Sequence, residues 1–139
     1  MIRSVRLLVA AFVLAAFATV PLLTRGAESN LPNKWKITSI KLCRSAGGTL
    51  VRNVNAIGIY PVYSFFIPRP VWTVNGTVVE AQPIYEHGRL VAFELFNAAA
   101  YLKPGTKNII KFALPDQNAS KVFVYDKDRP APGQCYEFF

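Results

Sequence analysis

Glu86 and His87 form an adjacent pair of a carboxylate and an imidazole, the two groups that most often transfer protons in enzymes. His87 is the single histidine of the 139-residue chain. No activated serine or cysteine motif surrounds this pair, so a reacting group for it to serve is missing. We therefore expect His87 to be a loop histidine, and the sequence predicts no catalytic residue and no enzymatic activity.

Three aspartates in the last quarter of the chain, Asp116, Asp126 and Asp128, could offer oxygen ligands to a hard cation such as Ca²⁺. Lys127 and Arg129 alternate with two of them. Their positive charge repels a cation and can pair with the carboxylates instead. We therefore expect no metal site, and the sequence contains no motif that predicts a cofactor.

The two cysteines, Cys43 and Cys135, lie near the two ends of the part of the chain that is expected to fold. Export would expose them to oxidising conditions, so we expect them to form a disulfide. In the loop-entropy model, a disulfide that closes a loop of about 90 residues stabilises the folded state by at most roughly 4.6 kcal/mol. Two buried free thiols are the alternative.

The beginning of the chain has the composition of an export segment. Arg3 and Arg6 precede an apolar, uncharged run from Leu7 to Leu23. As a helix this run would rise about 25 Å, which is at the short end of what a bilayer core requires. Residues 1–27 therefore predict either a cleaved signal peptide or a membrane anchor, and residues 28–139 an extracytoplasmic domain, periplasmic or at the cell surface.

Two sites could accept a signal peptidase. Ala16-Phe17-Ala18 has small residues at the two positions that the peptidase pocket requires, and Thr24-Arg25-Gly26 is the second candidate. The apolar run continues beyond Ala18, which favours retention as an anchor. The sequence leaves both outcomes open, and in either case the domain lies outside the cytoplasm.

The net charge is moderate once the leading segment is set aside. The whole chain has a formal charge of +8, with 16 basic and 8 acidic residues. Three of the basic residues, Arg3, Arg6 and Arg25, belong to the leading segment, which leaves 13 basic residues against 8 acidic ones, or +5. These charges are scattered over the domain, so we expect solvated strand faces and no nucleic-acid partner.

The most unusual stretch is aromatic and runs from Tyr60 to Pro70, with three prolines bracketing it. Proline cannot take part in a central strand, so the stretch predicts an edge. If alternate side chains fill the core, Tyr60, Val62 and Phe66 face outward as an apolar docking surface. The alternative is that both faces are buried. The candidate docking residues are Tyr60, Val62, Tyr63, Phe66, Arg69 and Trp72.

Two local patterns predict particular strand features. Asn75-Gly76, between two apolar runs, tolerates the positive φ angles of a two-residue hairpin turn. In the first strand, Trp35 and Ile37 alternate in one phase and Ile40 and Leu42 in the other. We therefore expect a β-bulge near Ser39.

The remaining apolar runs are short and separated by glycine and proline at spacings of roughly eight to twelve residues, a pattern typical of all-β sandwiches. The fold class expected is a two-sheet antiparallel sandwich of about eight strands, with a small barrel second. Further strands are expected at Leu50–Asn55, Ile57–Ile67, Leu90–Phe96, Asn108–Leu114, Val122–Tyr125 and Gln134–Phe139, and one helical turn at Asn97–Leu102.

Two motifs carry a resemblance. Val74-Asn75-Gly76 and the segment from Leu102 to Ile110 resemble the VNG hairpin and the LKPGxNxI corner of bacterial Ig-like and jelly-roll sandwich modules. One residue is inserted between Gly105 and Asn108 relative to that corner. The resemblance implies a sandwich without an active site, and such modules mostly bind glycans or proteins or act as spacers.

The function expected is therefore that of a non-enzymatic exported envelope protein, a structural or accessory subunit that docks onto a larger protein assembly or self-assembles. The alternative is a glycan-binding module in which Tyr60, Tyr63, Trp72 or Tyr85 stack on sugar rings. The glycosylation sequons at Asn75 and Asn118 are treated as incidental, because turn geometry already explains Asn75.

Overall fold

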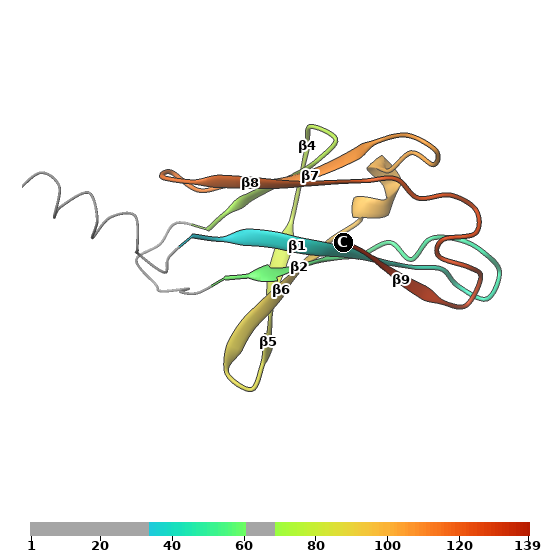
Figure 1. Cartoon of the computed structure of the whole chain (residues 1–139), viewed down its shortest axis with the longest axis horizontal. Coiled ribbons are helices and arrows are strands. Elements are labelled where there is room, and N and C mark those ends of the chain that lie inside the picture. The colour runs from blue at the N-terminus through green and yellow to red at the C-terminus, as the bar shows by residue number, and fades with distance from the viewer. Residues whose placement is uncertain (1–33, 61–68) are drawn as a thin grey trace, which may run out of the picture. The chain divides into compact units, whose positions relative to one another are not determined.

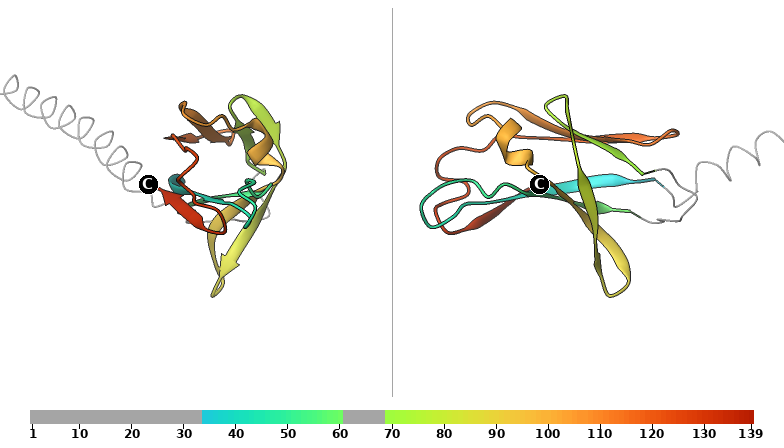
Figure 2. Two further views of the ribbon diagram at one scale, coloured as in Figure 1. Left: turned by 90° about the vertical axis from the view of Figure 1, so that its right-hand side faces the viewer. Right: turned by 180° about the vertical axis from the view of Figure 1, so that it is seen from behind.

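The computed structural model describes residues 34–60 and 69–139, which form two antiparallel β-sheets packed face to face (Figures 1 and 2). The five-stranded sheet has the order β5-β6-β2-β1-β9, and the four-stranded sheet has the order β4-β3-β7-β8. The expected all-β, two-sheet architecture is confirmed, with nine strands in these ranges. The elements are β1 (Lys36–Cys43), β2 (Val54–Ile59), β3 (Val71–Val74), β4 (Thr77–Val79), β5 (Ala81–Glu86), β6 (Arg89–Leu95), the 3₁₀ turn η1 (Ala98–Tyr101), β7 (Asn108–Ala113), β8 (Asn118–Phe123) and β9 (Cys135–Phe138).

Three strands differ from expectation. β2 is a single strand from Val54 to Ile59, where one strand at Leu50–Asn55 and the start of another at Ile57 were expected. β8 begins at Asn118, not Val122, because the β7–β8 turn is tight and is closed by a hydrogen bond from the Leu114 N–H to the Gln117 carbonyl, at 2.8 Å. β5 was not expected, since Pro83 interrupts it. It pairs only with β6, at an edge of the sheet, where the missing N–H of a proline is tolerated.

The expected hairpin and bulge are both confirmed. Asn75 and Gly76 have φ angles of 48° and 85° and join β3 to β4, as a two-residue hairpin turn requires. The pairing of β1 with β2 shifts register between Ile37 and Ser39. Because of this bulge, Ile37 and Ile40 are both buried in the core although they are three residues apart.

The core between the sheets is built around five aromatic side chains. The ring centroids of neighbouring pairs lie 5.1–6.5 Å apart, and the rings meet edge to face or at a tilt. These are the arrangements that the aromatic quadrupole favours. Contacts such as Trp72 with Phe93 join the two sheets directly. The five residues are Trp35, Tyr60, Trp72, Phe93 and Phe112.

Cys43 and Cys135 form the expected disulfide, with an S–S distance of 2.02 Å. They lie directly opposite each other on β1 and β9, so the bond fastens the edge strand β9 to its neighbour β1. A disulfide of this kind is typical of extracytoplasmic proteins. The predicted signal peptide or anchor, residues 1–27, lies outside the described residues. Within them, no helix is long and apolar enough to cross a membrane.

Arg44 ties together two loops at the end of the sandwich near the disulfide. Its guanidinium donates to the carbonyl oxygens of Pro130 at 2.7 Å, Asp126 at 2.8 Å and Gly48 at 3.0 Å. It also lies 5.9 Å from the centre of the Tyr125 ring. A planar guanidinium can satisfy several carbonyls at once, whereas a lysine ammonium lacks this fork geometry. Arg44 thus has a structural role.

The corner before β7 is organised by the fully buried side chain of Asn108. Its Oδ1 accepts hydrogen bonds from the Lys103 N–H and from Asn75 Nδ2, at 2.8 and 2.9 Å. Its Nδ2 donates to the carbonyls of Lys103 and Thr106, at 2.9 and 3.1 Å. The carbonyl oxygen and the amino group of the Asn108 side chain are thus both hydrogen-bonded inside the protein. This explains why the corner motif contains an asparagine at this position.

The Asn75 sequon is also accounted for by this corner. Asn75 Nδ2 donates to the Tyr101 carbonyl at 2.8 Å as well as to Asn108, and Asn75 Oδ1 accepts from the Ile109 N–H at 2.9 Å. A glycan on Nδ2 would replace one of its two hydrogens, so one of these bonds would be lost. The Asn75 amide therefore serves the fold.

Candidate functional site

The structure corrects part of the predicted docking surface. Tyr60 and Trp72 are only 4% and 1% exposed, so the expectation that they face a partner is wrong. Both continue the inward alternation of their strands, Tyr60 after Val54 and Ala56, and Trp72 with Val74. Arg69 is exposed. Val62, Tyr63 and Phe66 lie outside the described residues.

Tyr60 folds back along its own strand. Its hydroxyl donates to the carbonyl of Ala56 at 2.9 Å, and its ring lies against Gly58. A Cβ at Gly58 would be 2.7 Å from Tyr60 Cζ and would meet the Lys36 carbonyl oxygen of the neighbouring strand. Glycine is therefore needed where the ring crosses the strand. Burial raises the pKa of the Tyr60 hydroxyl well above its ordinary value.

This raised pKa predicts a loss of stability in alkali. Above about pH 10 the unfolded state releases the Tyr60 proton while the folded state keeps it, so unfolding becomes easier by about 1.4 kcal/mol per pH unit. Tyr60→Phe should lower the free energy of unfolding by about 1 kcal/mol at neutral pH, where the hydrogen bond to Ala56 is lost. Its alkaline loss should be smaller than that of the wild type.

Urea unfolding between neutral pH and about pH 11 measures this difference. Tyr85→Phe is the matched control, because Tyr85 is 51% exposed. If the wild type and Tyr60→Phe lose stability in parallel above pH 10, the Tyr60 hydroxyl is not buried as described.

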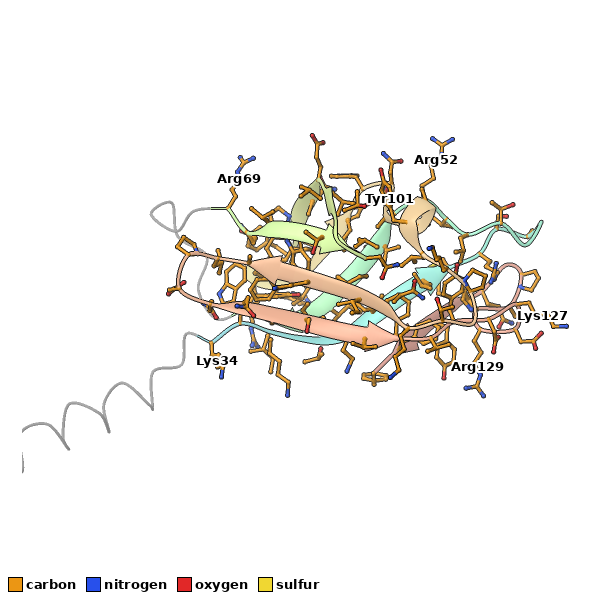
Figure 3. The ribbon with its side chains drawn as sticks, turned by 90° about the horizontal axis from the view of Figure 1, so that it is seen from above. Lys34, Arg52, Arg69, Tyr101, Lys127 and Arg129 are labelled. Carbon is orange, nitrogen blue, oxygen red and sulfur yellow. A yellow bond between two sulfur atoms is a disulfide. The ribbon has the colours of Figure 1, made fainter. Side chains whose placement is uncertain are left out.

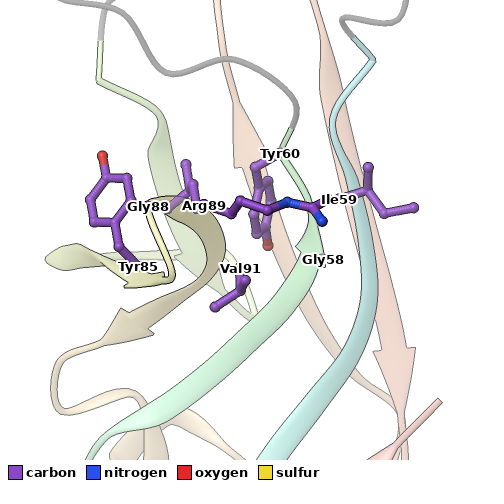
Figure 4. Close-up of a pocket in the computed structure, with 8 residues that line it drawn as sticks. Gly58, Ile59, Tyr60, Tyr85, Gly88, Arg89 and Val91 are labelled. Atoms are coloured by element: carbon purple, nitrogen blue, oxygen red, sulfur yellow. The ribbon is translucent and has the colours of Figure 1, made fainter.

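The glycan alternative loses support at two of its four aromatic residues, because Tyr60 and Trp72 are buried in the core. Tyr85 is exposed and, with Arg89, lines a pocket of about 430 Å³ where β2 and β6 separate beyond the pair Ile57 and Ala92. In Figure 4 the Arg89 side chain extends from the start of β6 toward β2. Among the described residues of this set, Tyr85 is the one that could stack on a sugar ring, and this pocket is where it would do so.

The residues considered for chemistry lie on turns. Glu86 and His87 are exposed at the β5–β6 hairpin, and His87 is one of its turn residues, with a φ of 51°. The Asp126 carboxylate accepts from the N–H groups of Asp128 and Arg129 at 2.8 and 3.0 Å. In the described ranges no three side chains of metal-binding type come together. The turn conformation of His87 and the hydrogen bonds of Asp126 account for these two residues as parts of loops.

The middle of the outer face of the five-stranded sheet is polar, although Ile59 at the end of β2 is 57% exposed. One row of directly paired residues crosses all five strands and consists of Gln82, Glu94, Asn55, Lys41 and Glu137. Glu94 accepts hydrogen bonds from Gln82 Nε2 at 2.9 Å, and Ser39 Oγ donates to Glu137 Oε1. This row has the composition of a solvated surface.

The outer face of the four-stranded sheet is different. Its central row pairs Val78 with Thr73, Thr73 with Lys111, and Lys111 with Ser120. Four large aliphatic side chains lie around this row with exposures of 45–67%. The four strands carry no carboxylate. We call this surface the aliphatic face; it consists of Val71, Thr73, Val78, Ile109, Lys111, Ala113, Ser120 and Val122.

Charged side chains of both signs lie beside the strands of the aliphatic face: Arg69 lies before β3, Glu80 follows β4, and Asp116 lies in the β7–β8 turn. Figure 3 looks onto the four-stranded sheet, and the labelled cations lie around the edge of this view. Arg69 lies two residues before Val71, the first residue of β3. The cations labelled there are Lys34, Arg52, Arg69, Lys127 and Arg129. An apolar centre with a charged margin is the usual organisation of a protein–protein interface.

A second groove, of about 670 Å³, borders the aliphatic face between the β3–β4 hairpin and the β5–β6 hairpin. Arg69 and Trp72 both contribute to its lining, as do Phe93 and Phe96. The indole N–H of Trp72 is buried and has no hydrogen-bond partner among the described residues. The groove thus joins two predicted docking residues, although only Arg69 is accessible.

No protein-family model, curated protein or solved structure matches this chain. Sequence reasoning missed the aliphatic face, although one signal was present: β-branched residues occupy the outward positions of four strands, where polar residues are usual.

Proposed function

We propose that this protein is a non-enzymatic, exported accessory subunit that docks onto a larger protein assembly through the aliphatic face. The observation that carries the proposal is the contrast between the two outer faces. The middle of one face is a row of polar and charged groups, with Ile59 exposed at the end of β2, and the other face presents four half-exposed aliphatic side chains with no carboxylate on its strands. Several large aliphatic side chains exposed on one face support an interaction site there.

The chemistry of the partner follows from the same face. Val78, Val71 and Ile109 suit an apolar partner surface, and Lys111 among them suits a carboxylate of the partner. The partner proposed is therefore a protein with an apolar surface that carries a carboxylate opposite Lys111.

The finer fold and the location belong to the same proposal. An Ig-like or jelly-roll module is supported by the VNG hairpin and by the asparagine of the corner motif, each of which has a structural role here. An extracytoplasmic location, periplasmic or at the cell surface, is supported by the disulfide and by the export-type leading segment.

The test compares two variants of the full chain. Each is expressed in the cells that naturally make the protein and is gently extracted from their envelope. Val78→Ser with Ile109→Ser removes two aliphatic side chains from the proposed interface and should weaken association with the partner by about tenfold or more. Ile59→Ser is the matched control, because Ile59 is 57% exposed but lies on the five-stranded sheet. Native mass spectrometry reports the fraction in complex.

A stoichiometric complex that survives Ile59→Ser and is lost in the double variant supports the proposal. A free monomer in the wild type contradicts it. In that case binding of oligosaccharides, with loss on Tyr85→Ala, would favour the glycan module, whose remaining pocket is lined by Tyr85 and Arg89.

A further inference from the structure

We infer that the free edge of β8 is a second binding site, which accepts an extended segment of a partner protein as an added β-strand. This site uses the backbone edge of β8, whereas the side chains of Ser120 and Val122 belong to the aliphatic face, and binding at the edge does not depend on docking at that face. The added strand would pair with β8 through its backbone and place alternate side chains into a cleft between β8 and β9.

The backbone groups of this edge follow from the register with β7. The Leu114 N–H donates to the Gln117 carbonyl and closes the turn, so these two residues are a hydrogen-bonded pair. In an antiparallel ladder every second pair is hydrogen-bonded, so the N–H and C=O groups of Ala119, Lys121 and Phe123 point toward β7. The N–H and C=O groups of Asn118, Ser120 and Val122 point the other way. Within the described ranges, no strand pairs with that side of β8.

The other three edge strands are poor acceptors. β5 contains Pro83 and a register irregularity between Ile84 and Tyr85, two features that prevent strand addition. β4 has three residues and β9 has four. β8 has six residues, no proline and an uninterrupted register. An extended segment would therefore find at β8 the longest regular set of free backbone partners among the described strands.

The inward side of this edge specifies the added strand. Phe123, Tyr136 and Phe138 line a cleft of about 350 Å³ between β8 and β9. Phe123 and Phe138 are 5.3 Å apart between ring centroids. Lys121 is on the same side of β8, two residues before Phe123, because it pairs with the buried Ile110. An added strand that matches both positions has a carboxylate opposite Lys121 and an aromatic side chain opposite Phe123, two residues apart.

The test uses a short synthetic peptide of alternating valine and threonine, with one glutamate and one phenylalanine separated by one residue, titrated onto the full chain. Ser120→Pro should weaken its binding by about tenfold, the order expected when one main-chain hydrogen bond is lost and the ring crowds the edge. The ladder with β7 should survive, since the Ser120 N–H points away from it. Ser120→Ala is the matched control and should bind normally.

Two further measurements do not depend on the folding of Ser120→Pro. Two N-methylated peptides are compared, one methylated at the odd residues and the other at the even residues. One of them should lose binding to the wild type and the other should keep it, because only one set of amides faces β8. Lys121→Glu should reverse the preference from the glutamate peptide to a lysine peptide. Equal effects of both methylation phases, or no binding by the wild type, would overturn the inference. Val78→Ser with Ile109→Ser should leave peptide binding unchanged, which separates this site from the aliphatic face.

Discussion

Replacing Gly58 with alanine is expected to lower the free energy of unfolding by about 3 kcal/mol or more, a large effect for one methyl group. The added Cβ would lie 2.7 Å from Tyr60 Cζ and 2.8 Å from its hydroxyl oxygen, and it would also meet the Lys36 carbonyl oxygen. Backbone cannot move aside as the end of a flexible side chain can. Either β2 separates from β1, or the Tyr60 ring leaves the core and loses its bond to Ala56.

Thermal and urea unfolding measure this loss, which corresponds to a fall in Tm of more than about 10 °C for a domain of this size. Gly47→Ala is the matched control, since its Cβ would find Ser45 Oγ at an ordinary 3.8 Å. We expect Gly47→Ala to stay within about 0.5 kcal/mol of the wild type. A wild-type melting curve for Gly58→Ala would show that Tyr60 does not pack against Gly58.

The second large effect is expected for Asn108→Leu, which should cost about 3 kcal/mol or more. The leucine is similar in size but cannot replace the four hydrogen bonds that Asn108 makes to Lys103, Thr106 and Asn75. Partners left unpaired in a buried corner each carry a desolvation cost. Since Asn75 shapes the β3–β4 turn, the change should also loosen that hairpin.

Asn108→Asp provides a graded test at the same position. Its carboxylate can still accept from Lys103 and Asn75, but its second oxygen would face the two carbonyls to which Nδ2 now donates. Burial should raise the pKa of this carboxyl, so the variant should be more stable below about pH 4 than at neutral pH, relative to the wild type. Asn118→Leu, at an exposed asparagine, is the control for both. Equal costs at positions 108 and 118 would contradict the corner network.

Much of the fold could be predicted from local patterns, because those patterns depend on neighbouring residues. The Asn75-Gly76 turn and the phase change near Ser39 are both local, and both are confirmed. The disulfide could be predicted from the expectation of export, which came from the leading segment. β5 could not, because its strand character comes from pairing with β6 and not from its own residues, among which Pro83 disfavours a strand.

The site was harder to predict because it depends on which strands are neighbours. Alternation shows that Val78, Ile109 and Val122 each face away from their strand's buried residues, but only the sheet order places them on one surface. Tyr60 was misassigned because its phase was counted from the aromatic stretch that follows it. Counting from Val54 in β2 gives the inward position observed.

Lysine acylation in the native complex tests the central claim most directly, because each outer face carries a lysine in its middle row. Lys111 lies on the aliphatic face, and Lys41 lies on the polar row of the five-stranded sheet. Both should react in the free protein. In the native complex, docking through the aliphatic face predicts that Lys111 is protected while Lys41 still reacts. Protection of Lys41 with continued reaction of Lys111 would contradict it.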